Sequence, residues 1–194
     1  MNKVEVLKNE LDYIKNERIK RSAEKLIEIV PDYFFEVPAS STGKYHPTFS
    51  QGEGGLLRHT KVATIIAKEI LSLEYTDSLF TEDEKDLMIL GIILHDTQKL
   101  GMPKEAHTRF DHPLLAANFI EENKDKTELT ETEIEFLKRI IASHMGQWNK
   151  SQYSNIELPK PEDKYEFFVH MCDYLSSKKF LDVRFDEDNN VKTR

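Results

Sequence analysis

The sequence reads Leu87-Met88-Ile89-Leu90-Gly91-Ile92-Ile93-Leu94-His95-Asp96 near its middle, an apolar run that ends in a histidine and an aspartate. Apolar residues occupy every side of a helical projection of this run, so a helix here would be buried all round. Thr81 and Glu84 form a capping-box pattern, which predicts that this helix runs from about 82 to 96. A carboxylate at the end of a buried helix is costly unless a partner neutralises it. A metal ion is one such partner, and the neighbouring histidine is a suitable ligand.

The composition is typical of a single globular domain spanning 1–194, with 39% hydrophobic and 32% charged residues. The net charge of −8 argues against binding of long duplex nucleic acid, although it leaves room for a local basic pocket. Cys172 is the only cysteine and cannot form an internal disulfide. No signal-peptide pattern and no apolar run of bilayer length is present. We therefore expect a cytoplasmic protein without a membrane association.

Helical periodicity recurs along most of the chain and predicts an all-α bundle. The expected helices cover 2–30, which is amphipathic and stopped by Pro31, then 56–74, 82–96, 112–124, about 130–144 and 162–184. Long loops at 31–55, 97–111 and 145–161 separate some of them, and a polar tail, expected to fray, follows from 186 to 194. The first of these loops is a candidate lid over an active site.

Histidines and aspartates fall on the inner faces of the predicted helices. Each histidine alone is best explained as a core residue, but the set is not. It comprises His59, His95, Asp96, His112, His144 and Asp173. Five helices that bring four histidines and two aspartates to one interior supply what a metal centre needs and what an apolar core avoids. Nitrogen and carboxylate ligands without thiolate suit Mn, Fe, Co, Ni or a catalytic Zn, with Mg as a further option.

The loop after Asp96 is cationic in an otherwise acidic protein. Lys99, His107 and Arg109 are either part of a solvated loop or positioned to bind an anion, and Lys99 is the best candidate for contact with a phosphate. Trp148 lies in the polar loop 145–161, where it is either a packing residue or a platform on which a base stacks.

The order of these motifs resembles the HD superfamily of metal-dependent phosphohydrolases. The resembling segments are Gly54-Gly55-Leu56-Leu57-Arg58-His59-Thr60, Ile93-Leu94-His95-Asp96-Thr97-Gln98-Lys99, Asp111-His112-Pro113, Ala142-Ser143-His144 and Cys172-Asp173. The resemblance spans about 55 to 180 and implies an all-α HD-domain bundle, here with an added N-terminal helix and long active-site loops. The segments 34–60 and 97–111 look most like the HD domain of bacterial 3′-5′ exoribonucleases, whose nucleic-acid-binding domain this sequence lacks.

The resemblance also implies roles for individual residues. His59, His95, Asp96 and Asp173 would hold one divalent metal, Asp96 would bridge, and His112 and His144 would hold a second. Many dinuclear members have a histidine pair where this chain has His144-Met145, which implies a thinner second site.

The implied activity is hydrolysis of a phosphate ester in a nucleotide, a cyclic nucleotide or an oligonucleotide end. Asp96 and Lys99 would be catalytic, and Lys99, Arg109, His107 and Trp148 would contact a small phosphorylated substrate. The alternative is a non-catalytic regulatory module that binds a nucleotide or a metal.

Overall fold

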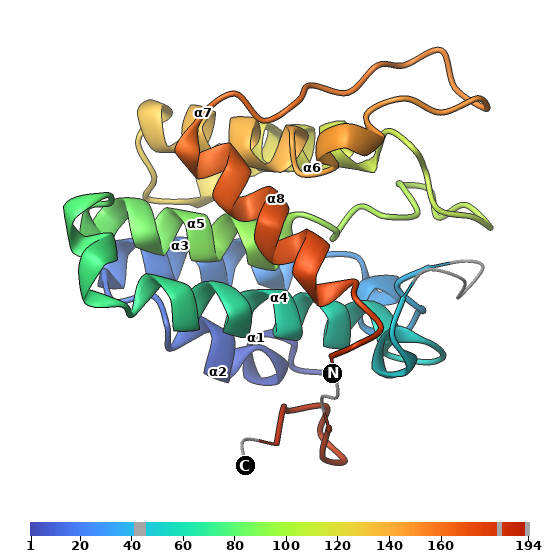
Figure 1. Ribbon diagram of the computed structural model, residues 1–194, viewed down its shortest axis with the longest axis horizontal. Coiled ribbons are helices and arrows are strands. Elements are labelled where there is room, and N and C mark those ends of the chain that lie inside the picture. Colours follow the sequence, from blue (N-terminus) through green and yellow to red (C-terminus); the bar gives the residue numbers. More distant parts are fainter. Residues whose placement is uncertain (41–45, 182–183, 193–194) are drawn as a thin grey trace.

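The computed structural model describes residues 1–40, 46–181 and 184–192. Within these ranges it is a bundle of eight α-helices without a β-sheet, which confirms the predicted all-α class (Figure 1). The helices are α1 (Lys3–Val6), α2 (Lys8–Leu11), α3 (Glu17–Glu28), α4 (Gly55–Leu71), α5 (Glu82–Leu94), α6 (His112–Asn123), α7 (Glu131–Ala142) and α8 (Lys164–Ser176). None of the helices in the described part of the chain combines the length and the apolar character needed to cross a membrane.

Helix α5 is the centre of the bundle. Every residue from Lys85 to Leu94 is buried, as the unbroken apolar run predicts. It packs against α3, α4, α7 and α8, and α8 crosses over α4 and α5 (Figure 1). Gly91 allows close approach to α7, because a Cβ atom there would lie 2.5 Å from Ile140 Cδ1. The buried face of α5 therefore fixes where its last residues, and the histidine and aspartate after them, lie.

Four helices begin at one end of the bundle, which we call the capped end. Their N-cap side chains accept hydrogen bonds from backbone N–H groups, and these residues are Asn16, Thr81, Thr130 and Asp163. The capping boxes predicted at Thr81 and Thr130 are both present. Each of these helices thus has one or two of its first backbone N–H groups satisfied by its own N-cap side chain.

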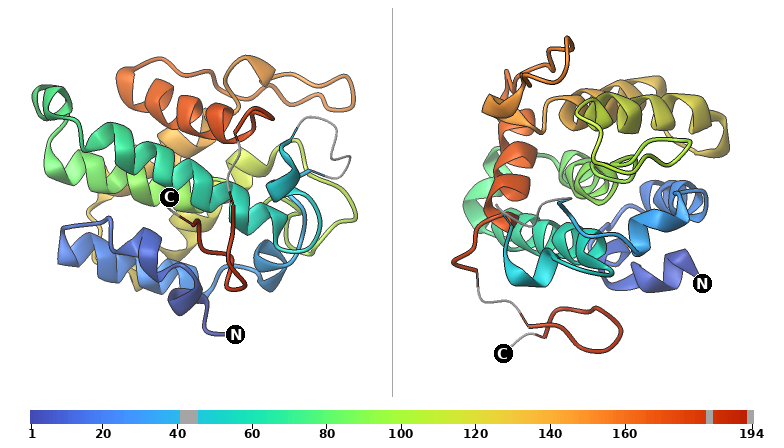
Figure 2. Two further views of the ribbon diagram at one scale, coloured as in Figure 1. Left: turned by 60° about the horizontal axis from the view of Figure 1, so that its bottom comes forward. Right: turned by 90° about the vertical axis from the view of Figure 1, so that its right-hand side faces the viewer.

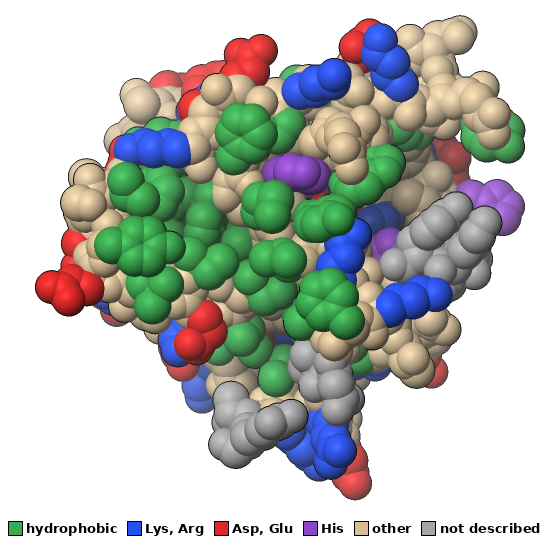
Figure 3. Space-filling view, viewed as in Figure 1, with side chains coloured by type: hydrophobic (Ala, Val, Ile, Leu, Met, Phe, Trp, Pro, Cys, Tyr) green, Lys and Arg blue, Asp and Glu red, His purple; other side chains and the backbone are tan. Residues whose placement is uncertain are grey.

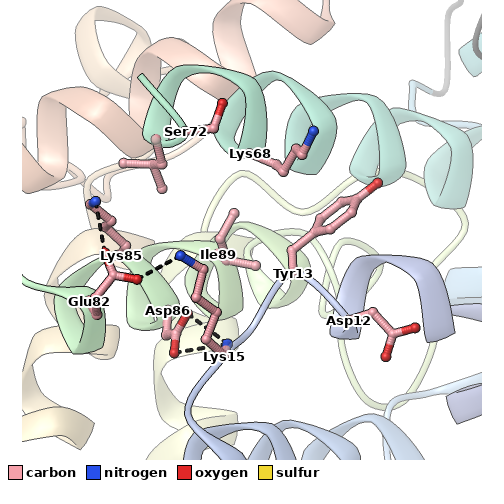
Figure 4. Close-up of a pocket in the computed structure, with 10 residues that line it drawn as sticks. Asp12, Tyr13, Lys15, Lys68, Ser72, Glu82, Lys85, Asp86 and Ile89 are labelled. Atoms are coloured by element: carbon pink, nitrogen blue, oxygen red, sulfur yellow. Dashed lines mark hydrogen bonds and ion pairs between the residues drawn. The ribbon is translucent and has the colours of Figure 1, made fainter. Parts of the chain in front are cut away.

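The prediction of one long helix over residues 2–30 is wrong, because α1, α2 and α3 replace it. The cause is a residue far along the chain. The buried Asp86 carboxylate on α5 accepts hydrogen bonds from the backbone N–H groups of Lys15 (3.1 Å) and Asn16 (2.7 Å). These contacts fix a turn between α2 and α3, and the Asn16 side chain then caps α3. Figure 4 shows Asp86 beside Lys15 in a hollow at the capped end.

The last helix also ends earlier than the predicted 184, at Ser176. The hydroxyls of Ser176 and Ser177 donate to carbonyls three residues back and so compete with continued helical bonding. The described part of the tail does not fray as expected. Phe185 and Val191 form a β-bridge, and the Asn189 side chain accepts a 2.7 Å hydrogen bond from Arg58 on α4. Residues 193–194 of the expected polar tail lie outside the described ranges.

Part of the predicted loop 31–55 is also structured, with short 3₁₀ turns at Asp32–Phe35 and Thr48–Ser50. Arg58 donates to the carbonyls of Phe49, Gln51 and Glu53, which holds this segment against the start of α4. Residues 41–45, within the candidate lid, lie outside the described ranges.

Candidate metal centre

The structure brings all six predicted ligands together at the end of the bundle opposite the capped end, which we call the histidine end. Here α5, α7 and α8 finish and α4 and α6 begin. The four histidines and Asp96 are at most 2% exposed, and the Asp173 side chain is 20% exposed. Three loops gather around this end, on the right-hand side of Figure 1 and facing the viewer in the right panel of Figure 2.

Three of the histidines are oriented in the same way by their own local turn. In each, ring Nδ1 lies within hydrogen-bond distance of the carbonyl three residues earlier: His95 with Ile92 (2.6 Å), His112 with Arg109 (2.7 Å) and His144 with Ile141 (2.7 Å). A carbonyl can only accept, so Nδ1 carries the proton in all three. Nε2 is then the free donor atom for a metal, and the carbonyl fixes both the tautomer and the ring orientation.

His59 reaches the same state through a residue distant in the sequence. Its Nδ1 lies 3.1 Å from Ser176 Oγ at the end of α8. Because Ser176 Oγ already donates to the Asp173 carbonyl at 2.7 Å, it accepts the His59 Nδ1 proton. Nε2 of His59 is therefore also free to bind a metal.

One group of donor atoms forms around Asp173. Its Oδ1 lies 2.9 Å from His59 Nε2 and 3.5 Å from His95 Nε2. Asp96 Oδ2 lies 3.3 Å from His95 Nε2 and 3.7 Å from His59 Nε2. His59, His95 and Asp173 offer ligand atoms close enough together to hold one metal ion.

A second group forms around the other oxygen of the same aspartate. Asp96 Oδ1 lies 3.0 Å from His112 Nε2 and 3.8 Å from His144 Nε2, and these two nitrogens are 3.2 Å apart. His95, Asp96 and His144 also meet the geometric requirement for a metal site. When both histidines carry their proton on Nδ1, two nitrogen lone pairs face each other beside a carboxylate, an arrangement that a cation stabilises.

Two buried polar atoms at this point have no hydrogen-bond partner among the described residues, namely His95 Nε2 and Asp96 Oδ1. Buried polar atoms without a partner are uncommon and costly. The residues present therefore fit a divalent metal.

The electrostatics of the centre follow from its crowding. Burial opposes the charge on Asp96, but Lys99 and His95 outweigh it and hold the pKa of that carboxyl well below its usual range. Burial likewise opposes the charge on His95, yet Asp96 and Asp173 raise its pKa to about 10. The pKa of His144 is lowered to about 3 by burial and by the nearby charge on His95. Without a metal, Asp96 and Asp173 thus favour a second proton on His95, at Nε2, the atom that would otherwise bind the metal.

Lys99 lies beside Asp96 at the centre, as the sequence predicts. Its Nζ is 2.6 Å from Asp96 Oδ2, and the side chain is 11% exposed. The ammonium group therefore lies in the cluster beside Asp96, where its positive charge can attract an anion.

The other three predicted substrate contacts do not join the cluster. The Arg109 guanidinium is held by Asp111 through two hydrogen bonds (2.8 and 2.6 Å) and by Glu105 (2.6 Å). His107 is exposed. Trp148 stacks on Tyr174 with ring centroids 5.5 Å apart, which favours the packing alternative. A carboxylate two residues after Arg109 was the local signal that its charge would be neutralised.

His46 is the residue at this centre that sequence patterns did not single out. Its ring centroid is 5.5 Å from that of His59, and its buried Nδ1 has no hydrogen-bond partner within the described residues. Burial, together with the charges of His59 and Lys99, lowers the pKa of His46 to about 4. It lies in a loop without periodicity, so only its residue type could have suggested it.

A helical bundle that collects four histidines and two aspartates at one buried point is an α-helical protein whose side chains could hold a metal ion. Comparison with protein families gives the same assignment: the HD-domain model matches residues 56–178. The chain therefore belongs to the HD-domain family, the superfamily of metal-dependent phosphohydrolases that its motifs resemble. No solved structure matches the chain significantly. The narrower resemblance to exoribonucleases is not confirmed by these comparisons and stays a prediction.

Proposed function

We propose that this protein is a metal-dependent phosphohydrolase that cleaves a phosphate ester of a nucleotide, a cyclic nucleotide or an oligonucleotide end. The proposal rests mainly on one observation: the two oxygens of the buried Asp96 carboxylate face two different pairs of histidines. Asp96 directs Oδ2 toward His59 and His95 and Oδ1 toward His112 and His144. An aspartate placed in this way suits a bridge between two metal ions.

In this proposal His59, His95, Asp96 and Asp173 hold one divalent ion, and Asp96, His112 and His144 hold a second. A bound ion of this kind lowers the pKa of its water toward about 7 and so makes hydroxide available at neutral pH. Mn, Fe, Co, Ni and Zn all suit these ligands, and Mg is a further option.

Two side chains of the centre serve the phosphoryl group. Lys99 donates one of its three ammonium hydrogens to Asp96, and the other two would neutralise charge on phosphoryl oxygens. His46, with its partnerless Nδ1 beside His59, supplies a further polar contact. Arg109 has the role of a positioning residue, because its guanidinium is engaged and its carbonyl orients His112.

The net charge of −8 supports a small substrate bound locally over long duplex nucleic acid or a membrane surface. The proposed location is the cytoplasm. A regulatory module that binds a nucleotide or a metal without turnover is the alternative, and the first experiment separates the two.

That experiment measures metal content by elemental analysis in the wild-type chain and in Asp96→Ala. Hydrolysis of bis-p-nitrophenyl phosphate is measured on the same samples with added Mn, Fe, Co, Ni, Zn or Mg. Asp86→Asn is the control, since Asp86 is a buried aspartate near the start of α5, whereas Asp96 follows the end of that helix.

We expect nearly two ions per chain and hydrolysis in the wild type and the control, with both lost in Asp96→Ala. About one ion with hydrolysis would leave His112 and His144 as substrate-contacting groups. A bound metal without hydrolysis of any tested phosphate ester would favour the regulatory module. Neither metal nor hydrolysis would overturn the proposal.

A further inference from the structure

A cleft of about 470 Å³ adjoins the metal centre, and the proposed function assigns no ligand to it. Its walls come from two loops, 105–111 and 145–156, and His112 lies where it meets the centre. Figure 3 shows that the molecule is hollowed on its right-hand side. One basic residue, Arg109, is among the residues that line the cleft. Its volume lies in the range of small-molecule sites, so it can hold a group attached to a phosphate that is bound at the metals.

One wall is a loop with a fixed base and an exposed tip. Asn149 and Leu158 are buried and close the base with two hydrogen bonds, Leu158 N to Asn149 O (2.9 Å) and Asn149 Nδ2 to Leu158 O (3.0 Å). Tyr153 lies near the tip and lines the cleft, yet its side chain is 89% exposed. An aromatic ring that borders a cleft on a pinned loop is a ready platform for a planar ligand.

The opposite wall contains Arg109, whose positive charge is paired with carboxylates. Gly101, with φ of +73°, gives Arg109 the space to lie there, because a Cβ atom would approach Arg109 Cδ to 2.9 Å. The guanidinium donates hydrogen bonds to Asp111 and Glu105. One guanidinium against two carboxylates leaves this wall with a net negative charge, which repels a second phosphate group.

Uncharged hydrogen-bonding groups complete the cleft. Thr108, Ser151 and Ser154 are among its lining residues, as are the apolar residues Phe110 and Ile156. Apolar and aromatic surface with a few polar groups is what a nucleoside binds, whereas a polyphosphate requires clustered cations.

We propose that this cleft is the subsite for the uncharged, planar group esterified to the scissile phosphate, with a nucleoside as the chemical class and Tyr153 as its stacking platform. The inference rests on the proposed function and deepens it. A nucleoside monophosphate, or the last nucleotide of a short chain, is then preferred over nucleoside diphosphates and triphosphates.

The test compares Tyr153→Ala and Tyr153→Phe with wild type and with Tyr75→Ala, an exposed tyrosine on the turn Glu74–Ser78 away from the cleft. Hydrolysis is measured with 5′- and 3′-ribonucleoside monophosphates and with glycerol 2-phosphate, which has no ring. Binding of radiolabelled nucleoside monophosphates is measured in parallel by equilibrium dialysis, so the result does not depend on turnover.

We expect Tyr153→Ala to raise KM and Kd for the nucleotides roughly tenfold, the size of one lost base–aromatic contact. Glycerol phosphate kinetics stay unchanged, and Tyr153→Phe and Tyr75→Ala behave as wild type. An unchanged nucleotide Kd in Tyr153→Ala would overturn the subsite even if hydrolysis is robust. Absence of all hydrolysis with a weakened Kd would overturn the proposed function and keep the subsite.

The charge of the cleft is tested with Glu105→Gln, which removes one carboxylate from the wall. We expect wild type to prefer nucleoside monophosphates over diphosphates in kcat/KM, and this substitution to reduce the preference about two- to fivefold, the effect of a partly exposed charge. A wild-type preference for diphosphates would contradict the neutral-group assignment.

Discussion

The two ends of this bundle contrast in how they treat buried charge, although one buried aspartate lies near the start of α5 and the other directly follows its end. At the capped end Asp86 is 3% exposed and accepts three contacts from backbone N–H groups. The lysines in the hollow beside it are paired: Lys15 and Lys85 both contact Glu82 (Figure 4), and Lys85 also contacts Asp77. Lys68 is paired with Glu69. At the histidine end Asp96 is fully buried, and one of its oxygens has no hydrogen-bond partner in the described structure.

The contrast teaches that burial of a carboxylate alone does not mark a functional site. Burial raises the pKa of Asp86 despite its backbone hydrogen bonds, whereas Lys99 and the histidines hold the pKa of Asp96 well below its usual range. What distinguishes the histidine end is a set of acceptor atoms directed at one another. Such a set requires a cation, whereas the capped end is complete as it stands.

The largest expected effect is the loss of metal binding and hydrolysis at the histidine end. Asp96→Ala removes the group shared by both sets of ligands, so metal content falls to background and phosphate ester hydrolysis falls by at least about 10³-fold, because water activation is lost. Elemental analysis and the bis-p-nitrophenyl phosphate assay measure the two losses. Retention of both would mean that Asp96 is only a packing residue.

The second effect weakens one ligand without removing it. Ser176→Ala deletes the acceptor for the His59 Nδ1 proton, so the ring loses its fixed orientation and metal affinity falls about ten- to a hundredfold. Titration with Mn or Zn by calorimetry measures the affinity. Ser177→Ala is the matched control, since its hydroxyl donates to the Tyr174 carbonyl instead. Equal affinities in the two variants would argue against the positioning role.

The third effect is a loss of stability at the capped end that leaves metal binding at the histidine end unchanged. In Asp86→Asn an amide N–H₂ replaces one acceptor and faces a backbone N–H group of residue 15 or 16. We expect the free energy of unfolding in urea to fall by about 1–3 kcal/mol. Metal content and hydrolysis should match wild type, and their loss would show that the two ends are not independent.

The smallest effect concerns an ion pair that joins α3 to α7 near the capped end. Arg18 donates two hydrogen bonds to Glu133 (2.8 and 2.6 Å), and this contact lowers the pKa of that carboxyl to about 2. The unfolded value is about 4.3. The pair therefore stabilises the fold above about pH 4.3, and its contribution is lost as the pH falls toward about 2.

Glu133→Gln should thus lower the free energy of unfolding by about 0.5–1 kcal/mol at pH 7, with a difference from wild type that shrinks below about pH 4.3. Urea unfolding between pH 7 and pH 3 measures the difference, with Glu131→Gln as the exposed control in the same helix. A difference that grows on acidification would contradict the sign.

Sequence patterns predicted those features that depend on local periodicity and residue type. The apolar run and capping box located α5, and the recurrence of histidine and aspartate on inner faces located all six candidate ligands. Features set by distant partners were not predictable in this way. The break between α2 and α3 depends on Asp86, some 70 positions later, and the orientation of His59 depends on Ser176. The placement of His46 depends on Arg58, which holds its loop.

The way the four histidines are oriented has a consequence for folding. His95, His112 and His144 receive their tautomer from the turn in which they stand, so each is ready as soon as that turn forms. His59 becomes ready only when α8 docks on α4 and brings Ser176 and Asp173 with it. An ion held by His59 and Asp173 would therefore act as a clasp between two segments more than a hundred positions apart, and metal binding and closure of the bundle become one event.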